Sequence, residues 1–228
     1  MKIPHWFFWD YLTQYDGDKH QSYFDAYKFI KAVKGDEFNG HLRAKLKSGK
    51  VVKLYHKDSE KISQLALDLI GAKALPKIMD QDTDLMPIPN SDMIPKSGET
   101  HKIISAADRV VKAYSSTDPK HSLTLNSGLR WTSKKRPSHK ESGSRNMERY
   151  EGKLTLTKKV KRPIILFDDV YTSGSQAKAA CKFLTDSELE VLGVVTLAKT
   201  THTPNKKAFE WREDVCEYDD SPFDWDSF

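Results

Sequence analysis

The chain has 228 residues, of which 38% are hydrophobic and 30% charged, which is enough to bury the core of one elaborated α/β domain. No apolar run approaches the length of a membrane span, and the two cysteines can form neither a disulfide framework nor a four-thiolate zinc site. We therefore expect a cytoplasmic protein in reducing surroundings.

Charge is distributed unevenly along the chain. The formal net charge is +5, but from Trp211 onward there are seven acidic residues and one basic residue, so the preceding 210 residues carry +11. A basic body of this kind favours anionic ligands such as polyphosphates or nucleic acid. The acidic C-terminal tail, residues 206–228, could compete for that surface or could simply be solvated.

Residues 1–80 are predicted to form an N-terminal accessory α+β region. The first 38 residues are rich in aromatics and include a helical pattern around Phe24 and Tyr27. A hairpin is expected over residues 41–56 and a helix over residues 57–75. The aromatics could pack in the core, or form an interface with a protein partner or a second copy. Interleaved with lysines, they could also stack on single-stranded nucleic acid.

The next predicted elements are a short strand at residues 85–89, a helix over residues 99–114 and a strand at residues 121–125. The stretch that follows, residues 126–152, is long, basic and weakly periodic. A connection of this length inside a compact domain indicates a lid or disorder. Its charges would equally serve nucleic-acid binding or simple solvation.

The most informative stretch begins with the apolar run Ile164–Phe167, which is typical of a strand buried on both faces. Asp168 and Asp169 follow it, and because unpaired buried charges are costly, we expect them at the carboxyl edge of the sheet. Next come a hydroxyl-rich glycine turn, residues 172–175, and an amphipathic helix. A second buried strand, residues 191–198, completes a parallel βαβ unit.

This order of elements predicts a phosphate site with a sugar site beside it. The N–H groups at a helix start favour a phosphate, and glycine lets the backbone approach it. Carboxylates only accept hydrogen bonds, so two adjacent acids suit the hydroxyls of a ribose. The alternative is a strand followed by a capped helix, in which acids and hydroxyls merely satisfy the backbone of the loop.

The segment from Ile164 to Ser175 closely resembles the signature of the phosphoribosyltransferases, and the resemblance extends over about residues 83–200. It implies an open, mostly parallel twisted sheet flanked by helices, of the type I phosphoribosyltransferase class. It also implies that Asp168 and Asp169, the candidate catalytic pair, hold the ribose hydroxyls of phosphoribosyl pyrophosphate. Mg²⁺ would arrive with this ligand, near the two acids. The implied contacts of the 5-phosphate are Thr172, Ser173, Gly174 and Ser175, and Tyr171 is a further implied substrate-binding residue.

The sequence Pro87-Ile88-Pro89 and the basic stretch at residues 126–152 resemble the ComF-like branch of this family. The basic stretch then corresponds to a mobile hood over the pyrophosphate. The implied pyrophosphate contacts are Asn90, Ser91 and Lys96 after the first core strand, and Arg130 and Arg145 in the hood. ComF-like relatives usually carry a four-cysteine zinc ribbon, which this sequence lacks.

The resemblance implies a core at residues 81–205 that transfers or exchanges the phosphoribosyl group at the anomeric carbon. No general base for a particular nucleobase is evident in the sequence. One alternative is a noncatalytic regulator of the same fold that binds phosphoribosyl pyrophosphate or a nucleotide. Another is an effector in DNA metabolism or phage defence, which would bind nucleic acid through the basic hood and a protein partner through the aromatic region.

Overall fold

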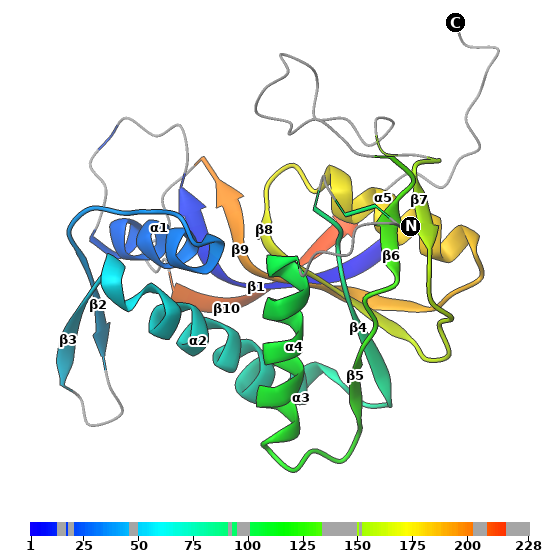
Figure 1. Ribbon diagram of the computed structural model, residues 1–228, viewed down its shortest axis with the longest axis horizontal. Coiled ribbons are helices and arrows are strands. Elements are labelled where there is room, and N and C mark those ends of the chain that lie inside the picture. The colour runs from blue at the N-terminus through cyan, green and yellow to red at the C-terminus, as the bar shows by residue number, and fades with distance from the viewer. Residues whose placement is uncertain are drawn as a thin grey trace, which may run out of the picture.

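The computed structural model describes residues 1–12, 17, 21–45, 50–90, 93–94, 101–133, 150, 152–202 and 209–217. At its centre is a six-stranded sheet in the order β10-β1-β9-β8-β4-β5 (Figure 1). The strands are β1 (Lys2–Leu12), β4 (Thr83–Pro87), β5 (Leu123–Leu125), β8 (Ile164–Tyr171), β9 (Val191–Thr201) and β10 (Phe209–Glu217). Only the β1–β10 pairing is antiparallel. The expected open, mostly parallel α/β sheet is confirmed.

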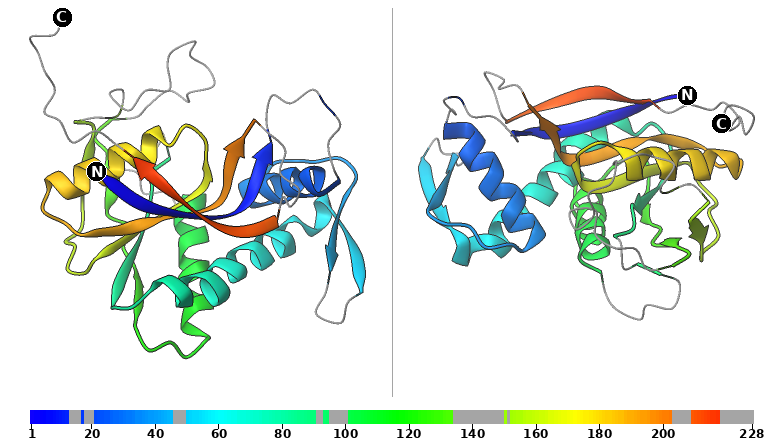
Figure 2. Two further views of the ribbon diagram at one scale, coloured as in Figure 1. Left: turned by 180° about the vertical axis from the view of Figure 1, so that it is seen from behind. Right: turned by 90° about the horizontal axis from the view of Figure 1, so that it is seen from above.

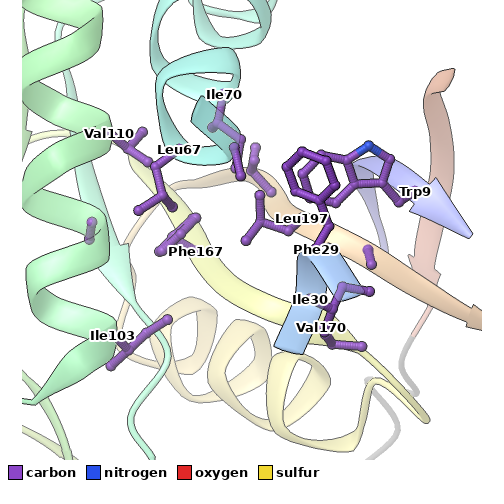
Figure 3. Packing of buried hydrophobic residues seen from close by; sticks show 14 of the residues in the cluster. Trp9, Phe29, Ile30, Leu67, Ile70, Ile103, Val110, Phe167, Val170 and Leu197 are labelled. Atoms are coloured by element: carbon purple, nitrogen blue, oxygen red, sulfur yellow. The ribbon is translucent and has the colours of Figure 1, made fainter. Parts of the chain in front are cut away.

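Helices cover both faces of this sheet. They are α1 (Gln21–Lys34), α2 (Ser59–Leu69), α3 (Leu75–Ile78), α4 (Lys102–Ser115) and α5 (Ser175–Asp186). Side chains of β8 alternate between two apolar clusters: Ile165 and Phe167 lie in one, Ile164 and Leu166 in the other. The first cluster joins β8 to α1, α2 and α4 (Figure 3), and the second joins it to α5. Burial on both faces explains the continuous apolar run in this strand.

The aromatic N-terminus is a strand of the main sheet, which corrects the expectation that the first residues belong to an accessory layer. β1 lies between β9 and β10, with Ile3 in one apolar cluster and Trp9 in the other. Trp6 packs where Gly193 of β9 has no side chain, since a Cβ there would overlap the indole ring. The strand is therefore part of the core.

Other elements of the first 80 residues agree with the sequence analysis. The hairpin strands are β2 (His41–Lys45) and β3 (Val51–Tyr55), which pair with each other and not with the main sheet. The helix expected at residues 57–75 is a succession of a 3₁₀ turn (His56–Asp58), α2, a π turn (Ile70–Ala74) and α3. Figure 2 shows the hairpin and α1 together at one end of the molecule.

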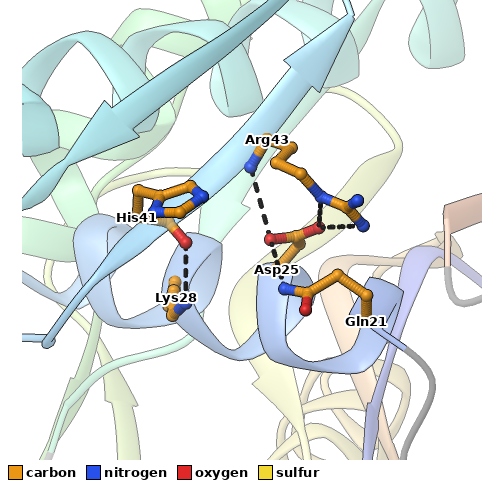
Figure 4. A network of polar contacts seen from close by, with 5 residues as sticks. All are labelled: Gln21, Asp25, Lys28, His41 and Arg43. Carbon is orange, nitrogen blue, oxygen red and sulfur yellow. Dashed lines mark hydrogen bonds and ion pairs between the residues drawn. The ribbon is translucent and has the colours of Figure 1, made fainter.

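A polar network fastens the hairpin to α1 (Figure 4). Asp25 of α1 is buried, and its carboxylate accepts hydrogen bonds from the backbone N–H of Arg43 at 3.3 Å and from the guanidinium at 3.3 and 3.4 Å. Lys28 donates to the carbonyl of His41 at 2.7 Å. A buried carboxylate is stable only when its oxygens are satisfied in this way. The hairpin thereby fixes the position of α1.

The beginning of the acidic tail is an edge strand. β10 pairs with β1, and charged residues of β10 form ion pairs with its neighbours: Asp214 pairs with Lys199 of β9, and Arg212 pairs with Asp10 of β1. These ion pairs explain how a charged segment can lie on the sheet. The rest of the predicted tail, residues 206–208 and 218–228, lies outside the described residues.

Two short strands were not predicted from the sequence. β6 (Leu129–Trp131) and β7 (Leu154–Leu156) form an antiparallel hairpin at the base of the predicted hood. Trp131 is fully buried and donates its indole N–H to the carbonyl of Pro89 at 2.8 Å. The hood is therefore tied to the loop after β4. Residues 134–149 and 151, which make up most of the hood, lie outside the described residues.

Candidate functional site

The turn between β8 and α5 is built around Gly174. This residue has φ +73°, and a Cβ on it would overlap the hydroxyl and Cζ of Tyr171 and lie 2.7 Å from Cε1. Only glycine combines this backbone conformation with such a close approach. The Ser173 and Ser175 hydroxyls lie 2.9 Å apart at the start of α5. The sequence thus places hydroxyl groups and the N-terminus of a helix at one point, as a phosphate site requires.

Asp168 and Asp169 lie directly before this turn. Asp168 Oδ1 accepts the N–H of Asp169 at 2.8 Å, and Asp169 Oδ1 accepts the N–H of Val170 at 2.7 Å. One oxygen of each acid thus satisfies the backbone, as the alternative interpretation of the motif expects. Asp169 Oδ2 forms an ion pair with Lys34 Nζ at 3.6 Å. The oxygens that accept the backbone N–H groups are the Oδ1 atoms, so a ligand would approach the Oδ2 side of each acid.

The electrostatics of the pair are unfavourable without a cation. Burial raises the pKa of Asp168 well above its ordinary value, and the charge of Asp169 raises it further. The Lys34 ammonium acts in the opposite direction and lowers this pKa. A bound cation, or hydroxyl donors from a sugar, would favour the ionised form of Asp168.

These groups open into a cavity of about 250 Å³, lined by the acid pair and the turn, residues 168–177, together with Lys34, Asn90 and Tyr150. A second cavity of about 200 Å³ shares Lys34, Asn90 and Asp169 with it and adds Lys102. The neighbouring cavities therefore combine carboxylates with two ammonium groups. Such a mixed site can bind hydroxyl groups and anions side by side.

The cavities lie at the topological switch point of the sheet. From β4 the chain passes through α4 to β5 on one side, and from β8 it passes through α5 to β9 on the other. Ligands of open α/β sheets bind in the crevice that this divergence leaves at the carboxyl ends of the strands. Asn90, which follows β4, and the acid pair of β8 face each other across it.

The structure brings together most of the residues that the sequence singled out. Those lining the larger of the two cavities are Asn90, Asp168, Asp169, Tyr171, Thr172, Ser173, Gly174 and Ser175. Ser91, Lys96 and Arg145 lie outside the described residues. Arg130 lies in β6 and donates to the carbonyl of Leu129 at 2.8 Å; it lines neither cavity.

Two basic residues that line the cavities were not identified from the sequence. Lys34 is in the last turn of α1, and Lys102 is the first residue of α4. Lys102 Nζ donates to the Lys34 carbonyl at 3.0 Å, and the chain turns there at Gly35, whose φ is +72°. The one feature of the sequence that could have indicated Lys34 is the basic last turn of α1, and a basic last turn is common to many helices.

The acid pair could take part in holding a metal ion only with help from a ligand. No group of three or more His, Cys, Asp or Glu side chains is suitably placed among the residues described. Mg²⁺ is commonly bound by one or two carboxylates plus the phosphates of a substrate. The Oδ2 atoms of the two acids fit that arrangement, with Asp169 Oδ2 also paired with Lys34.

Comparison with known proteins gives weak structural likeness only. No family model and no curated protein matches the chain. The structure is similar to a hypoxanthine phosphoribosyltransferase from Staphylococcus aureus (11% identity, 64% of this chain and 69% of that chain, TM-score 0.36). Similar values hold for an adenine phosphoribosyltransferase (12%, 77% and 89%, 0.37) and for the orotate phosphoribosyltransferase of Aeropyrum pernix (14%, 78% and 83%, 0.35). With TM-scores below 0.5, the likeness adds nothing to what the sheet order shows.

Among the residues that the structure describes, no helix is both long and apolar enough to cross a membrane.

Proposed function

We propose that the chain binds phosphoribosyl pyrophosphate and transfers or exchanges its phosphoribosyl group at the anomeric carbon. The observation that supports this most strongly is that the acid pair and the turn at residues 172–175 open into one cavity at the switch point of the sheet. A phosphate site and a hydroxyl-binding site are adjacent there. The distance between them along the chain is only a few residues, which suits a phosphorylated sugar.

Different residues of the site would bind different parts of the ligand. The turn and the start of α5 would bind the 5-phosphate, and Asp168 and Asp169 the ribose hydroxyls. Asn90, with Lys34 and Lys102 beside it, would bind the pyrophosphate. Mg²⁺ would supply further positive charge at the pyrophosphate. The remaining predicted contacts of the pyrophosphate are Ser91, Lys96, Arg130 and Arg145.

In the proposed reaction, the bond from the anomeric carbon to the pyrophosphate oxygen breaks and a bond to the acceptor nucleophile forms. The bonding electrons leave with the pyrophosphate, and the acceptor loses its proton to water. Catalysis of this kind depends on holding the reactants in line and neutralising the leaving group. The ammonium groups of Lys34 and Lys102 lie where they could contribute to that neutralisation.

Calorimetric titration with phosphoribosyl pyrophosphate, with and without Mg²⁺, tests the proposal. Wild type should bind, more tightly with Mg²⁺, and D168N/D169N should lose binding. The matched control is D118N/D186N, which removes two exposed carboxylates far from the cavity and should bind as wild type does. Absence of binding by the wild type, or equal binding by D168N/D169N, would refute the proposal.

Release of pyrophosphate across a panel of nucleobases then separates an enzyme from a sensor. Binding without release with any base would favour the noncatalytic regulator, which would use the same cavity. The ComF-like branch is a further prediction that rests on the sequence around Pro87 and Pro89 and on the basic stretch at residues 126–152. A role in DNA metabolism or phage defence is a prediction that rests on the basic hood and the aromatic N-terminal region. Protein or nucleic-acid partners would be tested separately.

A further inference from the structure

The connection from β7 to β8 carries four bases in five residues: Lys158, Lys159, Lys161 and Arg162, here named the basic segment. The three lysines are exposed and the arginine is half-buried. Within the described residues, none of the four forms an ion pair with a carboxylate. Like charges placed so closely repel one another, so the segment favours an anionic partner.

The backbone of the basic segment is held in place. It runs beside residues 122–128 in the opposite direction: Thr157 N–H donates to Gly128 O at 2.8 Å, and Asn126 Nδ2 donates to Lys159 O at 3.4 Å. The two chains approach so closely that a Cβ on Gly128 would lie 2.8 Å from the Cβ of Lys158. A fixed backbone reduces the entropy lost when the lysines bind a partner.

The bases border a groove of about 320 Å³, in which Asp84, Thr124 and Asn126 also lie. Asp84 accepts a hydrogen bond from Asn126 at 3.1 Å, so its charge is engaged within the fold. Arg162 Nη1 donates to the hydroxyls of Ser122 and Thr124, both at 2.9 Å, which orients the guanidinium. The groove shares no residue with the cavity of the acid pair.

We propose that the basic segment binds the phosphate backbone of nucleic acid without reading its base sequence. The five residues span at most about 13 Å, the length of a fully extended chain at ~3.3 Å per residue, and the bends at Lys158 and Arg162 shorten it, so the bases can contact neighbouring phosphates. Exposed lysines contribute little to binding one small anion in water, whereas a polyanion releases condensed counterions at each contact. No aromatic side chain lines the groove, so it offers no stacking platform for bases.

The test is fluorescence anisotropy with a labelled 30-base-pair DNA duplex and a labelled 30-nucleotide single strand, at increasing NaCl. The variant is K158Q/K159Q/K161Q. The control is K53Q/K57Q/K61Q, which removes three exposed lysines that lie in β3, in the 3₁₀ turn and in α2, respectively. Binding by the triple variant should be at least tenfold weaker. On the duplex, the slope of log K against log [salt] should be smaller in magnitude than that of wild type by about 2.7, because each of the three lost phosphate contacts contributes ~0.9. The control should keep the slope of wild type.

Several outcomes would overturn the proposal. One is no binding by wild type at 50 mM NaCl, and another is an unchanged slope in K158Q/K159Q/K161Q. Competition by polyglutamate or tripolyphosphate as effective as that by unlabelled DNA, at equal charge, would show that the segment does not prefer a nucleic-acid backbone. The duplex and single-strand arms decide which form is preferred.

Discussion

Gly174→Ala should destabilise the protein by a predictable amount. The left-handed conformation at φ +73° costs alanine about 1–2 kcal/mol, and alanine recovers ~0.4–1 kcal/mol by restricting the unfolded chain. Overlap of the new Cβ with the buried Tyr171 ring adds an overpacking cost of about 1–3 kcal/mol. The expected total is about 1–5 kcal/mol.

Gly152→Ala is the matched control. Gly152 has φ +63°, and a Cβ there would meet no atom within 4 Å. The substitution therefore carries only the conformational cost, a net loss of about 1 kcal/mol or less. At this chain length ~1 kcal/mol shifts Tm by about 2–4 °C, so G152A should lower Tm by a few degrees at most. G174A should lower it by at least about twice as much.

Calorimetric melting of both variants, and of G174A combined with Tyr171→Leu, checks the argument. Leucine removes the hydroxyl oxygen and the two ring atoms that the new Cβ would approach most closely. The double variant should therefore be more stable than the sum of the single losses predicts, by about 1 kcal/mol or more. Equal Tm shifts for G174A and G152A, or strict additivity with Y171L, would refute the packing of Tyr171 beneath the turn.

Three further outcomes are expected. Burial lowers the pKa of His5 to about 3, so the unfolded chain takes up the proton first as the pH falls, and stability should be lost between about pH 6.5 and 3. His5→Gln should flatten that part of the curve in denaturant titrations, and an unchanged slope would contradict this. Lys34→Gln should raise the pKa of Asp168 further in a carboxyl NMR titration, since the ammonium lowers it; a fall would contradict the geometry. Hydrogen bonding to Cys181 lowers the pKa of Cys216 to about 7, which by itself would make this thiol reactive. Cys181 and Cys216 are both fully buried, however, so a water-soluble disulfide reagent should label neither until denaturant is added. Rapid labelling of the native protein would contradict their burial.

The centre of the fold could be predicted because its signals are local. The run Ile164–Phe167 shows burial on both faces, and the turn at residues 172–175 followed by an amphipathic helix shows where the strand ends. One strand, one turn and one helix lie within a few residues of each other. Their order was enough to place the acid pair at the carboxyl edge of the sheet.

Strands whose partners are distant in sequence were not predictable in the same way. β1 pairs with β9 and β10, which lie near the other end of the chain, and its aromatic residues fit equally well with a helix or an interface until those partners are known. The strands β6 and β7 have three residues each, too few to show a period of two. Both failures come from pairing information that the local sequence does not contain.

The first 80 residues contribute to the candidate site through the position of α1. Asp25 and Arg43 hold the hairpin against α1, and the last turn of α1 carries Lys34 to within 3.6 Å of Asp169. Two adjacent carboxylates repel each other, and this ammonium lies on the side where it opposes that repulsion. The polar network at the far end of α1 therefore contributes to the charge balance of the acid pair, because it fixes the helix that presents the lysine.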